Sequence, residues 1–140
     1  MKALIRLIIL AALAAGCGDS STSPRVFTDS LSLGTGRQGI DLVGETTTFT
    51  GGLITIYWRV ESREKLKSAD VEFMVEKYAE GGYETVYQTI NGPAGPVSNV
   101  VIASYYHTFG PGLFRATGFI GSARRVVGPE TFTVKEAVSP

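Results

Sequence analysis

The sequence predicts an all-β fold, an antiparallel β-sandwich of about seven to nine strands. In several segments apolar side chains alternate with polar ones, which is typical of half-buried strands. Turns rich in glycine and proline separate these segments, and beyond the N-terminal leader none of them has the spacing of an amphipathic helix. With 140 residues and a hydrophobic content of 44%, the chain is large enough for the core of one domain.

The N-terminal leader has the features of a cleaved signal helix. Lys2 and Arg6 precede an apolar segment at residues 7–15. This segment is too short to cross a bilayer, which takes about 20 apolar residues. It ends in the run Leu13-Ala14-Ala15-Gly16-Cys17, which holds the only cysteine and resembles the lipobox of bacterial lipoproteins. The alternative is a conventional signal peptide with a cysteine at this position by chance.

The lipobox resemblance implies a domain organisation and a location. Residues 1–16 would be the lipoprotein signal peptide, residues 17–25 the lipidated Cys17 with a flexible, serine-rich tether, and residues 26–138 the sandwich. Acylated Cys17, carrying chains of the palmitate type, would hold the protein in the lipid bilayer of the cell envelope. Because Gly18 rather than an aspartate follows the cysteine, the outer membrane is favoured if the organism has one.

The first strands are expected at residues 26–33 and 40–49, the second of these segments supplying one or two strands. Between them, residues 34–39 match the pattern G-x-G-x-x-G. A dinucleotide-binding fingerprint needs a helix to begin at these glycines, but the sequence that follows is typical of a strand. We therefore interpret residues 34–39 as a turn between strands.

Residues 53–60 and 69–78 give the clearest strand patterns. Ile54, Ile56, Trp58 and Val60 share one face of the first, and Val71, Phe73 and Val75 share the inner face of the second. The charged stretch at residues 61–68 is expected to be a long hairpin loop or a single helical turn. Three carboxylates are expected on a solvated outer face, paired with Lys or Arg across the strands: Asp70, Glu72 and Glu76.

The remaining strands follow the same alternation. Gly81-Gly82 predicts a hairpin turn into a strand at residues 83–90. Residues 97–106 are expected to form a central strand buried on both faces. Three further strands are expected at residues 113–120, 124–127 and 131–138. Phe132 and Val134 should face inward. Arg124-Arg125 should be a solvated pair or make a weak contact with anionic headgroups.

Two of these strands resemble those of a known class of sandwich. The Trp58 strand and the Gly-x-Phe-x-Ala-x-Gly strand at residues 112–118 resemble strands of immunoglobulin-like and fibronectin type III-like domains. The resemblance implies an immunoglobulin-like sandwich, although the chain lacks a cysteine pair. If Cys17 is acylated, no disulfide is available, so the core itself must stabilise the fold.

The densest aromatic cluster is the candidate contact site for a partner or ligand. It comprises Tyr105, Tyr106, His107 and Phe109, before a Gly-Pro-Gly loop. Exposed aromatic side chains can stack on sugars or bury against a protein. The alternative is that alternate members belong to the core while the others cover the sheet.

No pattern in the sequence predicts catalysis, a metal site or a cofactor. His107 is the only histidine, and no G-x-S-x-G nucleophile elbow accompanies it. The chain carries 13 basic and 13 acidic residues, without the basic clusters that nucleic-acid binding requires.

We therefore expect a non-enzymatic binding or accessory module of the cell envelope, whose partner is an envelope protein or a glycan. The alternatives are an envelope enzyme or small-ligand or glycan carrier with an unrecognised site, and a domain that stabilises a larger assembly.

Overall fold

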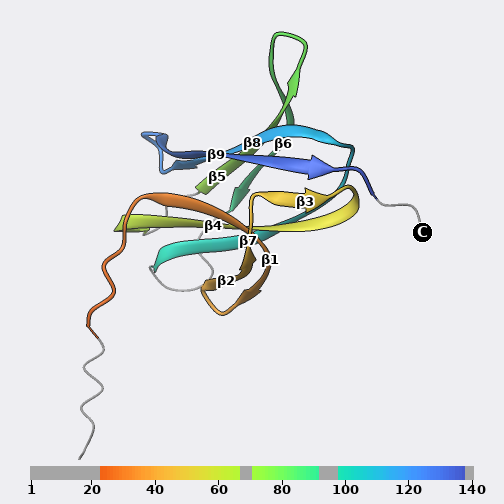
Figure 1. The fold of residues 1–140 in the computed structure, drawn as a ribbon. Helices are drawn as coiled ribbons and strands as arrows, with labels where there is room; N and C mark the ends of the chain where they lie inside the picture. Colours follow the sequence, from red (N-terminus) through yellow and green to blue (C-terminus); the bar gives the residue numbers. More distant parts are fainter. Residues whose placement is uncertain (1–22, 67–70, 92–97, 138–140) are drawn as a thin grey trace, which may run out of the picture.

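In the computed structural model two β-sheets pack face to face (Figure 1). The structure describes residues 23–66, 71–91 and 98–137. This part of the chain contains nine strands: β1 (Ser30–Gln38), β2 (Asp41–Glu45), β3 (Thr48–Thr50), β4 (Gly52–Leu66), β5 (Val71–Ala79), β6 (Gly82–Asn91), β7 (Ser98–Phe109), β8 (Gly112–Ile120) and β9 (Arg125–Lys135). The predicted all-β sandwich is confirmed.

The strand order is β2-β1-β4-β7 in the four-stranded sheet and β3-β9-β8-β5-β6 in the five-stranded sheet. Neighbouring strands are antiparallel except β3 and β9, which are parallel. The N-terminal connection enters at the end of the sandwich where β4 ends and β7 begins (Figure 1). Strand β9 ends at the opposite end, where the Gly51 amide donates to the Lys135 carbonyl at 2.7 Å.

Strand β4 is the longest strand and pairs with both β1 and β7. Its inner face follows the predicted alternation, because Ile56, Trp58 and Val60 are almost completely buried. The predicted hairpin loop at residues 61–68 is wrong for residues 61–66, which continue β4. Strand β4 then leads into β5 of the other sheet, so the two do not form a hairpin. Glu61 is buried and pairs with Arg59, and Glu64 stays exposed and pairs with Arg125, so both charges are accommodated in the strand.

The segment predicted as a turn at residues 34–39 is mostly strand. Strand β1 starts at Ser30, later than predicted, and continues through the glycines to Gln38, so that the turn falls at Gly39 and Ile40. A Cβ atom on Gly34 would lie 3.0 Å from the Val43 carbonyl oxygen of β2, which explains why this position holds glycine. Two strands follow, as the sequence allowed, and they belong to different sheets.

Two further predictions need correction, and two are confirmed. Strand β7 was expected at the centre of a sheet but lies at an edge. The two C-terminal segments form one strand, β9, whose register with β8 shifts between Ala116 and Gly118, opposite Gly128 and Pro129. The β5–β6 hairpin and the alternating strand β8 are present as predicted.

Aromatic rings form a continuous chain through the core between the two sheets. Trp58 of β4 stacks on Phe73 of β5. Further ring contacts lead through strands β6, β7, β8 and β9 to Phe49 of β3. The members of this chain, in order of contact, are Trp58, Phe73, Tyr87, Tyr105, Phe109, Phe114, Phe132 and Phe49. Such pairs add about 0.5–1.5 kcal/mol each beyond the burial of their area.

Candidate functional site

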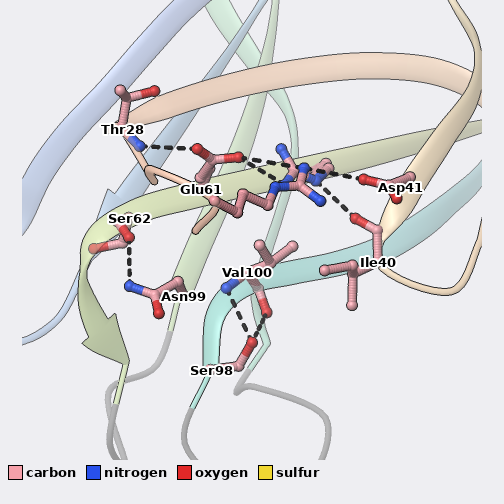
Figure 2. A network of polar contacts seen from close by, with 10 residues as sticks. Thr28, Ile40, Asp41, Glu61, Ser62, Ser98, Asn99 and Val100 are labelled. Carbon is pink, nitrogen blue, oxygen red and sulfur yellow. Dashed lines mark hydrogen bonds and ion pairs between the residues drawn. The ribbon is translucent and has the colours of Figure 1, made fainter. Parts of the chain in front are cut away.

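Ion pairs fasten the N-terminal connection to one end of the sandwich. We call this group the N-terminal clamp; its members are Arg25, Thr28, Asp29, Arg59, Glu61, Arg63 and Arg125. Glu61 of β4 is central to it (Figure 2). Its carboxylate accepts a hydrogen bond from the Thr28 amide at 2.8 Å and pairs with Arg59 at 2.6 Å.

The electrostatics of Glu61 favour its ionised form. Burial raises the pKa of this carboxyl, but the Thr28 hydrogen bond and the charges of Arg59 and Arg25 outweigh it, so the net pKa is lowered. The side chains of Glu61 and Arg59 are each only 10% exposed. Breaking a buried pair leaves the remaining charge desolvated, so loss of either partner should destabilise the fold.

The turn between β1 and β2 covers this pair from the solvent side. The Arg59 Nε donates a hydrogen bond to the Ile40 carbonyl oxygen at 2.7 Å, and Figure 2 shows Ile40 and Asp41 on the same side of the pair. Arg25 pairs with Asp41 at 3.0 Å and lies 3.9 Å from Glu61. The N-terminal connection and this turn therefore contact each other across the outer face of the four-stranded sheet.

Asp29 extends the clamp to the second sheet. Its carboxylate accepts a hydrogen bond from the Arg63 amide at 3.0 Å and lies 3.4 Å from the guanidinium groups of both Arg63 and Arg125. Arg125 belongs to β9, and it also pairs with Glu64 at 3.3 Å and donates to the Ser62 hydroxyl at 2.8 Å. The prediction that Arg125 is part of a solvated pair is therefore wrong, because it bridges β4, β9 and the N-terminal connection.

The structure does not bring the four predicted contact residues together on one surface. Tyr105 and Phe109 are buried, while Tyr106, at 65% exposure, points to the outer face of the four-stranded sheet. The exposed His107 lies on the same side of β7 as Tyr105, and their rings stack with centroids 5.4 Å apart. Alternate members thus belong to the core, as the second interpretation predicted. Cys17 lies outside the described residues.

Tyr105 also closes one side of the sandwich. Its ring stacks on Tyr87 of β6, at 3.4 Å between centroids, which joins the edge strands of the two sheets. Burial, with a smaller contribution from Tyr87, raises the pKa of Tyr105 to about 12. The predicted contact site therefore contains a structural tyrosine that stays neutral over the physiological range.

An open pocket lies on the outer face of the four-stranded sheet. It has a volume of about 330 Å³ and is lined by Arg37, Tyr57, Ile102, Ala103 and Ser104. Tyr57 of β4 lies opposite Ser104 of β7, and Tyr106 follows two residues later on the same face. The pocket thus combines a guanidinium group, a phenol and a hydroxyl, a set that sequence reasoning missed because the residues come from three separate strands.

The outer face of the five-stranded sheet carries two ion pairs, in each of which an arginine side chain lies over a buried carboxylate. Glu76 accepts hydrogen bonds from Arg115 at 2.5 and 3.0 Å, and Glu72 pairs with Arg124. The Glu76 hydrogen bond raises the pKa of Arg115. Each guanidinium also lies over an aromatic ring, Arg115 4.0 Å from the centroid of Tyr83 and Arg124 4.4 Å from that of Phe119.

The predicted pairing of Glu72 and Glu76 with basic residues is therefore confirmed, but their solvated setting is wrong. Both residues are buried under their partners. Asp70 lies outside the described residues. Arg124 is exposed, in keeping with the predicted solvated setting, and it also pairs with Glu72.

No protein-family model matches the chain, and no curated protein is similar to it. Among residues 23–66, 71–91 and 98–137, no three His, Cys, Asp or Glu side chains are grouped so that they could hold a metal ion. The described part of the chain also contains no helix with the length and hydropathy needed to cross a membrane.

Proposed function

We propose that this protein is a lipoprotein of the cell envelope, anchored in the bilayer by acylated Cys17, whose immunoglobulin-like sandwich acts as a non-enzymatic binding or accessory module. The N-terminal clamp is the observation that carries the proposal. It fastens the connection from the anchor to both sheets through Glu61, Asp29 and Arg125. A domain held in this way keeps one end toward the membrane.

The proposed tether limits how far the domain lies from the bilayer. Eight residue steps separate Cys17 from Arg25. A fully extended chain covers at most about 3.6 Å per residue, so the clamp would lie within about 29 Å of the acylated cysteine. The clamped end of the sandwich would then face the membrane, and the opposite end would face a partner.

The exposed aromatic residues lie away from the clamp. Tyr106 is opposite Thr55 on β4, six residues before Glu61, and a strand rises about 3.3 Å per residue. Tyr106 is therefore about 20 Å further from the membrane than the clamp in this arrangement. An exposed tyrosine offers both an apolar ring and a hydroxyl to a partner surface. We propose this end of β7, with Tyr106 and His107, as the contact region.

Lipid labelling tests the anchor directly. In cells fed a labelled palmitate, we expect the wild-type protein to incorporate label and the Cys17→Ser variant to remain an unlabelled, uncleaved precursor. The Ser20→Ala variant is the matched control and should be labelled like the wild type. Normal processing of the Cys17→Ser variant would show an ordinary signal peptide and overturn the lipid anchor.

Site-specific crosslinking in cells tests the contact region. A photoreactive amino acid at position 106 should yield an adduct with an envelope protein or glycan, which mass spectrometry would identify. The matched position is Lys65, which is exposed near the clamped end of β4. Adducts at position 65 but not at 106 would reverse the proposed orientation, and adducts at neither position would contradict a binding module.

The open pocket supports a second candidate function, that of a small-ligand or glycan carrier. Arg37, Tyr57 and Ser104 line it and suit an acidic sugar, since guanidinium pairs with a carboxylate and an aromatic ring stacks on a pyranose. Titration with uronic acid oligosaccharides, followed by nuclear magnetic resonance, should shift the resonances of these residues. Loss of the shifts in Arg37→Ala, with unchanged shifts in Arg63→Ala, would support the carrier over the protein-binding module.

A further inference from the structure

Strand β7 presents a free edge that lacks the usual protection. It is the last strand of the four-stranded sheet, so only one of its two edges pairs with another described strand. Its twelve residues, SNVVIASYYHTF, include no Asp, Glu, Lys, Arg, Gly or Pro. Natural proteins usually protect free edges with charges, prolines, bulges or short strands, because an exposed edge is a template for another strand.

The other edge strands of this protein carry such protection. Strand β2 has five residues, with exposed Asp41 and Glu45, and β3 has only three. Strand β6 carries exposed Glu84, and its pairing with β5 shifts register between Val75 and Glu76. Strand β7 is longer than any of them, and its pairing with β4 is regular from Gly52 to Glu61. The unprotected edge is therefore specific to β7.

We propose that β7 pairs antiparallel with β7 of a second copy of this chain, forming one continuous eight-stranded sheet across the dimer. A two-fold axis perpendicular to the sheet makes such a contact self-complementary. The outer face of one copy must continue as the outer face of the other. Since side chains alternate along a strand, opposing residues must then both be even-numbered or both be odd-numbered.

Only two registers combine this condition with pairing over nearly the whole strand. They place either Ala103 or Ser104 on the two-fold axis, and both of these side chains are small. In these registers Tyr106 lies opposite Val100 or Ile102 of the second copy, respectively. An aromatic ring facing a β-branched side chain contributes favourably to strand pairing. Tyr106, exposed in the single chain, would thus be flanked on one side by an apolar side chain of the second copy, and its outer side would stay open to a partner.

The absence of charge on β7 favours a second copy over an unrelated strand. Self-pairing about a two-fold axis brings identical side chains close together, so any Lys, Arg, Asp or Glu near the axis would face its own kind. Like charges directly opposite each other destabilise a strand pair. Strand β7 avoids this conflict at every position, which an unrelated partner of opposite charge would not require. The inference is independent of the lipid anchor.

The mass of the full-length protein in detergent solution tests the proposal. Sedimentation should give the dimer mass for the wild type and for Ser104→Thr, which is the matched control. Ser104→Lys and Ser104→Asp should each give the monomer mass, and an equimolar mixture of these two variants should recover the dimer. Ser104 is exposed, so both should fold, and circular dichroism with thermal melting checks this.

Crosslinking gives an independent readout. A short bismaleimide should link Ser104→Cys into dimers more strongly than Thr131→Cys, which lies exposed on β9 of the other sheet. Both variants retain Cys17, so any link through that residue is common to both. A monomeric wild type, or a Ser104→Lys variant that stays dimeric, would overturn the proposal. An adduct of Ser104→Cys with a different protein would replace the second copy by another strand donor.

Discussion

The indole ring of Trp58 lies flat against the ring of Phe73, with 4.6 Å between their centroids and 8° between their planes. Trp58 belongs to the four-stranded sheet and Phe73 to the five-stranded sheet, so this stack joins the two layers at the centre of the core. The indole Nε1 is buried without a hydrogen-bond acceptor. Trp58 therefore stabilises the fold through packing and not through its polar group.

This arrangement makes the effect of two substitutions at Trp58 differ. Trp58→Ala removes the whole ring and should lower the free energy of unfolding by about 3–5 kcal/mol. Trp58→Phe keeps an aromatic ring on Phe73 and removes the unpaired N–H, so its cost should be clearly smaller. Urea denaturation followed by circular dichroism measures both. Equal losses for the two variants would show that a phenyl ring at this position does not keep the stack on Phe73.

Gly118 of β8 is packed closely by Val127 of the neighbouring strand β9 and by Val60 of the facing sheet. A Cβ atom at this position would lie 2.6 Å from Val127 Cγ2 and 3.0 Å from Val60 Cγ2. Gly118→Ala should therefore overpack the core and cost about 1–3 kcal/mol. Gly82→Ala is the matched control, because a Cβ atom there meets nothing within 4 Å, and it should change stability by no more than about 0.5 kcal/mol. Thermal melting measures both variants, and equal melting temperatures would show that Val127 and Val60 shift enough to accept a methyl group.

The clamp predicts a pH dependence with a definite sign. The pKa of Glu61 is lowered in the folded protein, so its ion pairs stabilise the fold above the ordinary pKa of a glutamate and stop doing so as the pH falls through the lowered value. Glu61→Gln should destabilise the protein by about 1–3 kcal/mol at neutral pH and flatten this acid dependence. Asp41→Asn, at an exposed pair, should cost less than about 1 kcal/mol.

Denaturation at neutral and acidic pH compares the two clamp variants. An equal response of Glu61→Gln and Asp41→Asn at both pH values would show that the pair of Arg59 and Glu61 is as solvated as the exposed one.

Tyr105 predicts a loss of stability as the pH rises, whereas Glu61 predicts one as the pH falls. Its pKa is raised from 10.0 to about 12 by burial and by Tyr87, so the unfolded chain ionises before the folded one. The stability associated with the neutral phenol is complete below pH 10 and is lost as the pH rises from 10 toward about 12. Tyr105→Phe should lose less stability over this window than the wild type. Tyrosinate absorbance during alkaline titration checks the assignment, since one tyrosine fewer should titrate late.

The sequence predicted the fold well where each strand has one buried and one exposed face. The alternation around Trp58 and along β8 identified residues that are buried in the structure, such as Val60 and Phe114. These patterns are local, so they can be recognised without knowing the partner strand. The same reasoning gave, as the alternative to a contact site, the arrangement found here, in which Tyr105 and Phe109 belong to the core.

The errors share a physical cause: residues distant in the sequence supply the ion-pair partners and the packing that decide the structure of a segment. Glu61 and Glu64 suggested a loop, but Arg59 and Arg125 neutralise them within β4. The glycines of β1 suggested a turn, but Gly34 fits the close approach of β2. The position of β7 at an edge depends on strand order, which side-chain alternation does not specify. For the same reason, the clamp and the open pocket could not be predicted from spacing along the chain.

The N-terminal connection enters at one end of the sandwich, and β9 ends at the other. This arrangement determines how the protein would respond to mechanical load. A pull between these two points would run along β1 and β9, at right angles to the hydrogen bonds that join them to β4 and β8. Bonds loaded in this direction share the force and must rupture together, unlike bonds that unzip one after another. A domain built in this way would withstand tension applied between its two ends, as the proposed anchor and contact region would require.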